Sequence, residues 1–289
     1  MNTIIEKKRA DVSMYIDRHV ISEAAVQSIV VVGSVATGLA SARSDIDARV
    51  FLNPYDLYAV PAECKWQPDD DTFHGIMSPI ENPIQLDFKR LDLQEWSHPT
   101  HVWPEPILAE LQDGWIAFDR HGQIRPLITE RTAYTEEIRQ ARLDDALPFL
   151  DGLLNLSSID HNWTTLGANT AHDRLHAAYD YLVQALFAYN HRWRTWRSRE
   201  MTCLLKLPWL PENFSDHVLQ AANALSATKD GYEKRFKVLR HFFDAFVRQC
   251  HNDGLYGPDT VLDAFIRGHD EPGRDWNMAE WVQKHQNRT

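Results

Sequence analysis

Hydrophobic and polar positions follow two different periodic patterns along this chain of 289 residues. Before about residue 130, short β-branched or alternating runs are separated by proline, glycine and aspartate, and the prolines between residues 54 and 106 disfavour long helices. Beyond it, apolar residues recur every three or four positions, as in amphipathic helices. The pattern predicts an α/β (α+β) head with a mixed sheet, residues 1–130, followed by an all-α helical bundle domain, residues 131–289.

Individual elements can be predicted within each part. In the head, residues 4–20 are expected to form a helix, and strands are expected at 28–32, 45–52, 72–77, 84–91 and 115–118. In the bundle, stripes such as Tyr232, Phe236, Leu239 and Phe243 mark apolar helix faces. Helices are expected near 134–154, 171–190, 198–206, 214–227, 230–252 and 276–286.

Composition narrows the class of protein. The chain has 30 basic and 41 acidic residues, a formal charge of −11, which disfavours a general nucleic-acid binder and suits a small or cationic substrate. Its three cysteines form no CxxC pair, so neither a disulfide framework nor a zinc ribbon is supported. No apolar run approaches the roughly 20 residues that cross a bilayer, and the first residues are charged. We expect a cytoplasmic protein with no membrane partner.

The segment Val32-Gly33-Ser34-Val35-Ala36-Thr37-Gly38 carries the first chemical signal. A buried strand ends at Gly33, where glycine permits a sharp turn and a close approach of a ligand to the backbone. Backbone N–H groups opening a helix at Ser34, together with its hydroxyl, would suit a phosphate.

Three aspartates carry the second signal. Ten residues separate Ser34 from Asp45, and Asp45 and Asp47 would lie on one face of a strand. In the later run Ile84–Leu91, Asp87 alternates with apolar residues and would be exposed beside them. Converging carboxylates could hold one or two Mg²⁺ ions, activate a hydroxyl and neutralise a leaving pyrophosphate. Arg49 and Lys89 share these faces and would either touch phosphate or pair with a carboxylate.

These residues resemble a known signature. The string Gly-Ser-x-Ala-Thr-Gly-x(5)-Ser-Asp-Ile-Asp, from Gly33 to Asp47, is similar to that of the DNA polymerase beta-like nucleotidyltransferase superfamily. It most resembles the branch that modifies aminoglycoside or lincosamide antibiotics. The resemblance covers residues 25–125, and many members carry a C-terminal helical bundle that closes over nucleotide and substrate.

The resemblance implies roles for particular residues. Gly33 and Ser34 would bind the triphosphate, Asp45 and Asp47 would ligate Mg²⁺, and Asp87 would be a further ligand or the general base. The reaction would transfer a nucleoside monophosphate from a nucleoside triphosphate to a hydroxyl of a small molecule and release pyrophosphate.

The basic segment 191–206 in the helical part offers further candidates. One or two of Arg192, Arg194 and Lys206 would reach the β- and γ-phosphates, or the segment would be an amphipathic connector whose arginines face water. Its arginine-rich part, residues 191–199, favours an alternative, a toxin-type transferase that modifies tRNA or a protein side chain. A non-catalytic nucleotide-binding module is a third hypothesis. Arg235 and His241 match a spacing found in helical RNases, but we expect both at a helix surface without nuclease activity.

Overall fold

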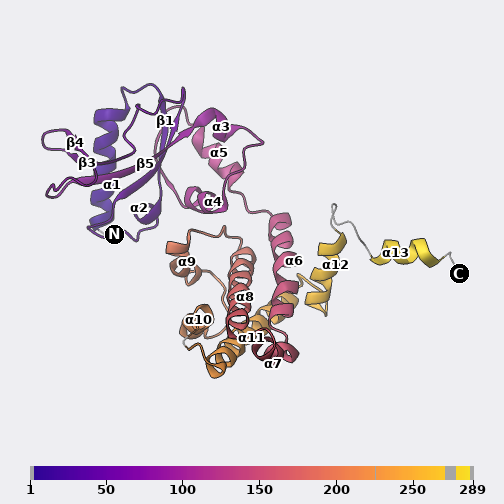
Figure 1. The fold of residues 1–289 in the computed structure, drawn as a ribbon. Helices are drawn as coiled ribbons and strands as arrows, with labels where there is room; N and C mark the ends of the chain where they lie inside the picture. The colour runs from indigo at the N-terminus through magenta and orange to yellow at the C-terminus, as the bar shows by residue number, and fades with distance from the viewer. Residues whose placement is uncertain (1–2, 225, 271–277, 287–289) are drawn as a thin grey trace. The chain divides into compact units, whose positions relative to one another are not determined.

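The computed structural model describes residues 3–224, 226–270 and 278–286, which fall into two compact units, Met1–Ala133 and Tyr134–Thr289. The first unit contains a mixed sheet with helices, and the second consists of helices (Figure 1). The predicted fold class, an α/β head followed by a helical region, is confirmed.

Six strands form the sheet of the first unit in the order β4-β3-β5-β2-β1-β6. Only β2 and β5 pair in parallel, and the remaining neighbours are antiparallel. Strand β3 was not predicted because Pro61 and Pro68 flank it closely and hide the alternation of Cys64 and Trp66. The strands are β1 (Val26–Val31), β2 (Ile46–Leu52), β3 (Glu63–Gln67), β4 (Thr72–His74), β5 (Ile84–Asp92) and β6 (Trp115–Asp119).

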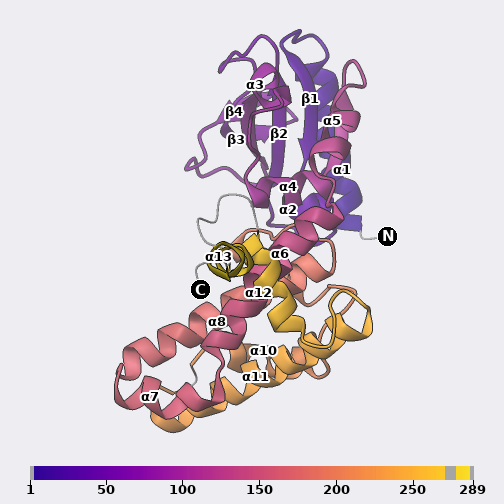
Figure 2. The same ribbon diagram turned by 90° about the vertical axis from the view of Figure 1, so that its right-hand side faces the viewer.

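One face of the sheet is covered by helix α1 (Thr3–Tyr15), which continues into a π-helical turn, Ile16–Val20 (Figures 1 and 2). The sheet contributes alternate residues of β1, β2 and β5 to this core, because successive side chains of a strand point to opposite faces. The opposite face of β2 is therefore left for polar residues and for the helices that follow β5.

Three short helices and one turn of helix complete the first unit: α2 (Gly33–Ala36), α3 (Leu93–Ser97), α4 (Glu105–Gln112) and α5 (Ile124–Arg131). Helices α3, α4 and α5 were not predicted. Pro106 sits in the first turn of α4, where a missing backbone N–H costs nothing, so a proline-rich segment still contains a helix of eight residues. The ring centroids of Trp96 in α3 and Phe51 in β2 are 6.4 Å apart, which places α3 on the face of β2 opposite α1.

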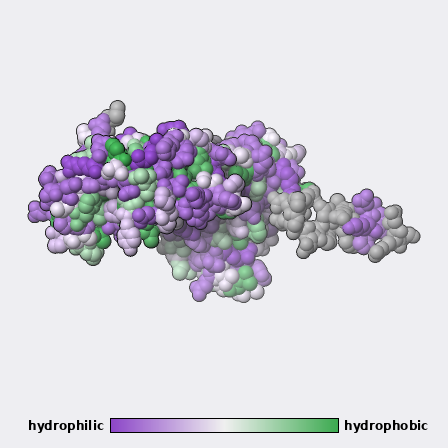
Figure 3. Space-filling view, turned by 90° about the horizontal axis from the view of Figure 1, so that it is seen from above, coloured by the Kyte–Doolittle hydropathy of each residue, from purple (hydrophilic) through white to green (hydrophobic). Residues whose placement is uncertain are grey.

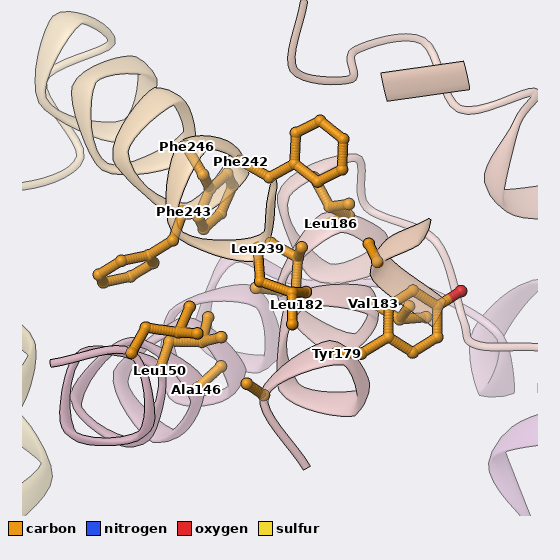
Figure 4. Close-up of a cluster of buried hydrophobic side chains, with 14 of the residues drawn as sticks. Ala146, Leu150, Tyr179, Leu182, Val183, Leu186, Leu239, Phe242, Phe243 and Phe246 are labelled. Atoms are coloured by element: carbon orange, nitrogen blue, oxygen red, sulfur yellow. The ribbon is translucent and has the colours of Figure 1, made fainter. Parts of the chain in front are cut away.

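The second unit packs its longest helices around one apolar core. Figure 4 shows side chains of α6, α8 and α11 meeting there, including Leu150, Leu182 and Phe243. The helices are α6 (Glu136–Leu153), α7 (Ile159–Thr164), α8 (Ala168–Tyr189), α9 (Arg197–Leu204), α10 (Phe214–Ala222), α11 (Lys229–Asn252), α12 (Thr260–Asp270) and α13 (Met278–His285). Five predicted helices overlap α6, α8, α9, α10 and α11. The sixth overlaps α13, although its residues 276–277 lie outside the described part, and α7 and α12 were missed.

Arg235 corrects one expectation. It is not at a helix surface but is only 4% exposed. Its guanidinium donates hydrogen bonds to the carbonyl oxygens of Ala221 and Ala222, at 2.9 and 3.0 Å, and so satisfies the C-terminal end of α10. The residue has a structural role in the bundle.

The face seen in Figure 3 is mostly hydrophilic, with small hydrophobic patches between hydrophilic residues. Among the described helices, none combines the length and the apolar character needed to cross a bilayer.

Candidate active site

Strand β1 is buried along its whole length and leads directly into the glycine turn. Gly33 has a φ of +67°, a left-handed conformation that a residue with a side chain adopts only with strain. The backbone N–H of Val32 donates a 2.9 Å hydrogen bond to the carbonyl oxygen of Asp47. The turn is therefore fixed beside the first residues of β2, and Ser34, which follows it, is 8% exposed.

The aspartates of the motif lie where β2 begins. Asp45 directly precedes the strand and Asp47 is its second residue, and both are half-buried. Ile46 and Ala48, on either side of Asp47, are fully buried in the core beneath α1. The alternation therefore turns Asp47 to the face opposite that core, as the sequence pattern predicts.

Asp87 joins this face from the neighbouring strand. In the parallel pairing of β2 with β5, Asp47 and Asp87 are register partners, so their backbones are about 4.8 Å apart. The neighbours Leu86 and Phe88 are buried, and Asp87 is half-buried. Two residues that lie 40 positions apart in sequence are thus brought side by side.

A fourth carboxylate continues the row and was missed by the sequence analysis. Glu63 of β3 is the antiparallel register partner of Asp87, and its side chain is exposed. Three adjacent strands therefore place Glu63, Asp87 and Asp47 at the same level of the sheet. Only the alternation in β3 could have pointed to Glu63, and that strand is too short and too close to prolines for a sequence signal.

The carboxylates do not form a ready-made metal cage. In the part of the chain that the structure describes, no group of three or more His, Cys, Asp or Glu side chains is close enough to hold a metal ion. Mg²⁺, however, is usually bound through one or two carboxylates, several waters and the phosphates of a substrate. Asp47 and Asp87, paired in register, supply two carboxylates of this kind, and Asp45 lies two positions before Asp47 in the chain.

The two cations on the same face differ sharply. Arg49 forms an ion pair with Glu110 of α4, and the two side chains are only 11% and 14% exposed. Lys89 is the register partner of Arg49, is exposed, and makes no ion pair with any described residue. The pair Arg49–Glu110 joins β2 to α4 and so supports the strand that carries Asp47. Neither Arg49 nor Lys89 is paired with Asp87.

The remaining predicted residues, Arg192, Arg194 and Lys206, belong to the second unit. Arg194 donates hydrogen bonds to Asp180 at 2.6 Å and to Glu200 at 2.5 Å. Burial alone would lower the pKa of Arg194, but the two carboxylates stabilise its charge and the pKa is raised. Arg192 and Lys206 are exposed. The three are therefore not equivalent, since the charge of Arg194 is already balanced inside its own unit.

Comparison with known proteins bears on the first unit. Residues 16–91, which include the glycine turn and all three aspartates, match the family model of the nucleotidyltransferase domain. A search of curated proteins finds no match. Ten chains of solved structures match, among them a nucleotidyltransferase-like protein from Exiguobacterium sibiricum, with 13% identity, 97% of this chain and 86% of that chain covered, and a TM-score of 0.39. Residues 16–91 are thus similar to a nucleotidyltransferase domain, and this match supports nucleotidyl transfer as the activity of the enzyme.

Proposed function

We propose that the protein transfers a nucleoside monophosphate from a nucleoside triphosphate to a hydroxyl group of a small molecule, with Mg²⁺ as cofactor. The observation that carries this proposal is the register of Asp47 and Asp87 beside the Gly33 turn. Carboxylates held side by side repel each other, and a cation bound at Asp47 relieves this repulsion while Asp87 remains available to accept a proton. The face therefore suits a metal-bound polyphosphate.

The residues have separate roles in this reaction. The backbone at Gly33 and the hydroxyl of Ser34 bind the triphosphate, and Asp45 and Asp47 hold one or two Mg²⁺ ions. When bound, the metal neutralises charge on the phosphates and makes the α-phosphorus easier to attack. Asp87 accepts the proton of the acceptor hydroxyl, whose oxygen then bonds to the α-phosphorus while the bond to the bridging oxygen breaks and pyrophosphate leaves.

Strand order supports the role of Asp87 as the base. Strand β2 lies between β5 and β1, so Asp87 is one strand further than Asp47 from the glycine turn. An acceptor that approaches Asp87 from the side of β3 would not displace phosphates bound at Gly33. The hydroxyl and the α-phosphorus can then be held together, which is most of what phosphoryl transfer requires.

The acceptor that we propose is an aminoglycoside- or lincosamide-like antibiotic. The net charge of −11 and the exposed carboxylate of Glu63 beside Asp87 favour a molecule that carries ammonium groups. A macromolecular acceptor such as tRNA is less favoured, because Arg194 and Arg197 in the basic segment are both paired with Asp180.

The test is an incubation of the protein with Mg²⁺, each of the four nucleoside triphosphates in turn, and a panel of antibiotics, followed by mass spectrometry. We expect one acceptor to gain the mass of one nucleoside monophosphate and an equivalent of pyrophosphate to be released. The variant Asp87→Asn should give neither product. Labelling of tRNA, with no modified antibiotic, would overturn the proposed acceptor, and pyrophosphate release that persists in Asp87→Asn would overturn the proposed site.

A further inference from the structure

Lys8 occupies an unexpected position on α1. The residues that face the sheet from this helix are Ile5, Val12 and Tyr15, all buried. Lys8 follows Ile5 by three positions and precedes Val12 by four, so it lies on the same stripe. An apolar residue usually occupies such a position, because a charged group rarely faces a core without a partner.

The ammonium group finds its partner next to the aspartate motif. Lys8 Nζ donates a hydrogen bond to the carbonyl oxygen of Ser44, the residue directly before Asp45. Burial lowers the pKa of Lys8, and the nearby charges of Asp11 and Asp45 act in the opposite direction. The partly buried charge is therefore held close to Asp45 by a contact between α1 and the loop that precedes β2.

The segment that Lys8 contacts is held at its beginning by α2 and the core, since Leu39 N donates to Ser34 O at 2.9 Å and Ala40 is buried, but its end at Ser44 has fewer contacts. Residues 37–45 connect α2 with β2 and form no helix or strand. Ser41 and Ser44 bond to each other, through Ser44 N to Ser41 O at 3.1 Å and Ser41 N to Ser44 Oγ at 2.9 Å, but these bonds lie within the turn. Lys8 ties the end of this turn to a helix that is itself packed on the sheet.

We propose that Lys8 is a positioning residue that fixes the Ser44 carbonyl and so holds Asp45 in place for binding the metal. The inference rests on the proposed function of Asp45 as a ligand. It concerns the backbone before Asp45, because Asp47 is already placed by the pairing of β2 with β5. Groups that hold a metal ligand in position contribute to affinity although they never touch the ion.

The sign of the effect separates positioning from simple electrostatics. A positive charge near Asp45 repels a divalent cation, so its removal alone would tighten metal binding. Loss of positioning would weaken metal binding instead. A direct contact between Lys8 and phosphate would weaken the binding of nucleotide even when no metal is present.

The experiment measures the binding of a non-hydrolysable nucleoside triphosphate by calorimetry, once with Mn²⁺ and once with a chelator. For Lys8→Met we expect binding about tenfold weaker with Mn²⁺ and unchanged with the chelator. Lys8→Arg should retain most of the affinity, since its guanidinium can also reach a carbonyl. Lys7→Met is the matched control, because Lys7 is exposed and carries the same charge one position away. Lys8→Gln serves as a second variant if Lys8→Met does not fold.

The outcomes distinguish this inference from the proposed function. Tighter binding of Mn²⁺–nucleotide by Lys8→Met, unchanged binding, or equal weakening with and without metal would each overturn the positioning role. Asp45→Asn is measured in parallel. If Asp45→Asn binds Mn²⁺–nucleotide as the wild type does, the proposed metal site is wrong and the role of Lys8 falls with it. If Asp45→Asn loses this binding and Lys8→Met does not, only the role of Lys8 is wrong.

Discussion

The two units of the protein arrange their charges in opposite ways. In the helical unit, buried carboxylates are matched: Asp144 accepts hydrogen bonds from Tyr256 at 2.8 Å and from Arg267, and Glu200 accepts one from Arg194. In the sheet unit, Asp87 is flanked in register by Asp47 and Glu63, and neither Asp87 nor Glu63 has an ion-pair partner among the described residues. Matched charges stabilise a fold, whereas adjacent like charges destabilise it and indicate a ligand.

The largest effect should come from Asp87. Asp87→Asn is expected to lower kcat/KM by about 10³-fold, because the acceptor hydroxyl loses its base. The same change removes like-charge repulsion, so the midpoint of thermal unfolding should stay the same or rise slightly. Enzyme kinetics and a melting curve check both parts. A variant that loses activity together with stability would show that Asp87 is structural.

The matched charges should behave in the opposite way. Arg194→Met leaves Glu200, which is 7% exposed, without its cation, and should lower the free energy of unfolding by about 4 kcal/mol. Chemical denaturation measures this change. A raised KM for the nucleotide with no loss of stability would instead support the role of Arg194 in binding phosphate that the sequence suggests.

The sheet unit also contains a matched ion pair, Arg49–Glu110, which is nearly buried like the pairs of the helical unit. It tests whether matched charges stabilise both units. Arg49→Met should cost about 3 kcal/mol, because Glu110 is left almost buried and unpaired. The double variant Arg49→Met/Glu110→Met should regain at least half of that loss, since neither charge then remains to be desolvated. Denaturation of the single and double variants provides a thermodynamic cycle, and an additive result would mean that the pair is not coupled.

The smallest effect concerns pH and the helical unit. Burial, followed by the nearby charge of Arg235, lowers the pKa of His172 below 6.5. As the pH falls, the unfolded chain therefore takes up a proton at His172 at a higher pH than the folded chain does. The contribution of His172 to stability is complete above pH 6.5 and declines as the pH falls below it. Melting curves should show a smaller loss between pH 7.5 and 5.5 for His172→Gln than for the wild type. Equal losses would mean that His172 titrates alike in the folded and unfolded chain.

The sequence predicts the parts of the site that depend on local pattern. Gly33, Ser34, Asp45 and Asp47 lie within one short segment, and the alternation around Asp47 and Asp87 correctly gives the face on which each side chain lies. The long bundle helices α6, α8 and α11 were recognised because their apolar residues repeat over four or more turns. Within a helix or a strand, the spacing of apolar residues along the sequence is enough to predict which face is buried.

The sequence does not predict the relations between distant segments. That Glu63 stands beside Asp87, that Glu110 neutralises Arg49, and that Lys8 reaches Ser44 all depend on strand order and helix packing. Short elements such as β3 and α4 were also missed, because five to eight residues next to prolines give no clear period. Arg194 is paired inside the helical unit and Arg192 is more exposed. This difference depends on contacts in the folded chain, so the number of basic residues in the segment does not reveal it.

The parallel pairing of β2 with β5 has a consequence for how preparations of this protein should be judged. Because side chains alternate, a slip of one residue between the two strands would bring Leu86 or Phe88 next to Asp47 and turn Asp87 into the apolar layer. Such a misaligned sheet would keep nearly the same circular dichroism spectrum. Specific activity, rather than secondary structure content, is therefore the sensitive measure of whether the chain has aligned its strands correctly.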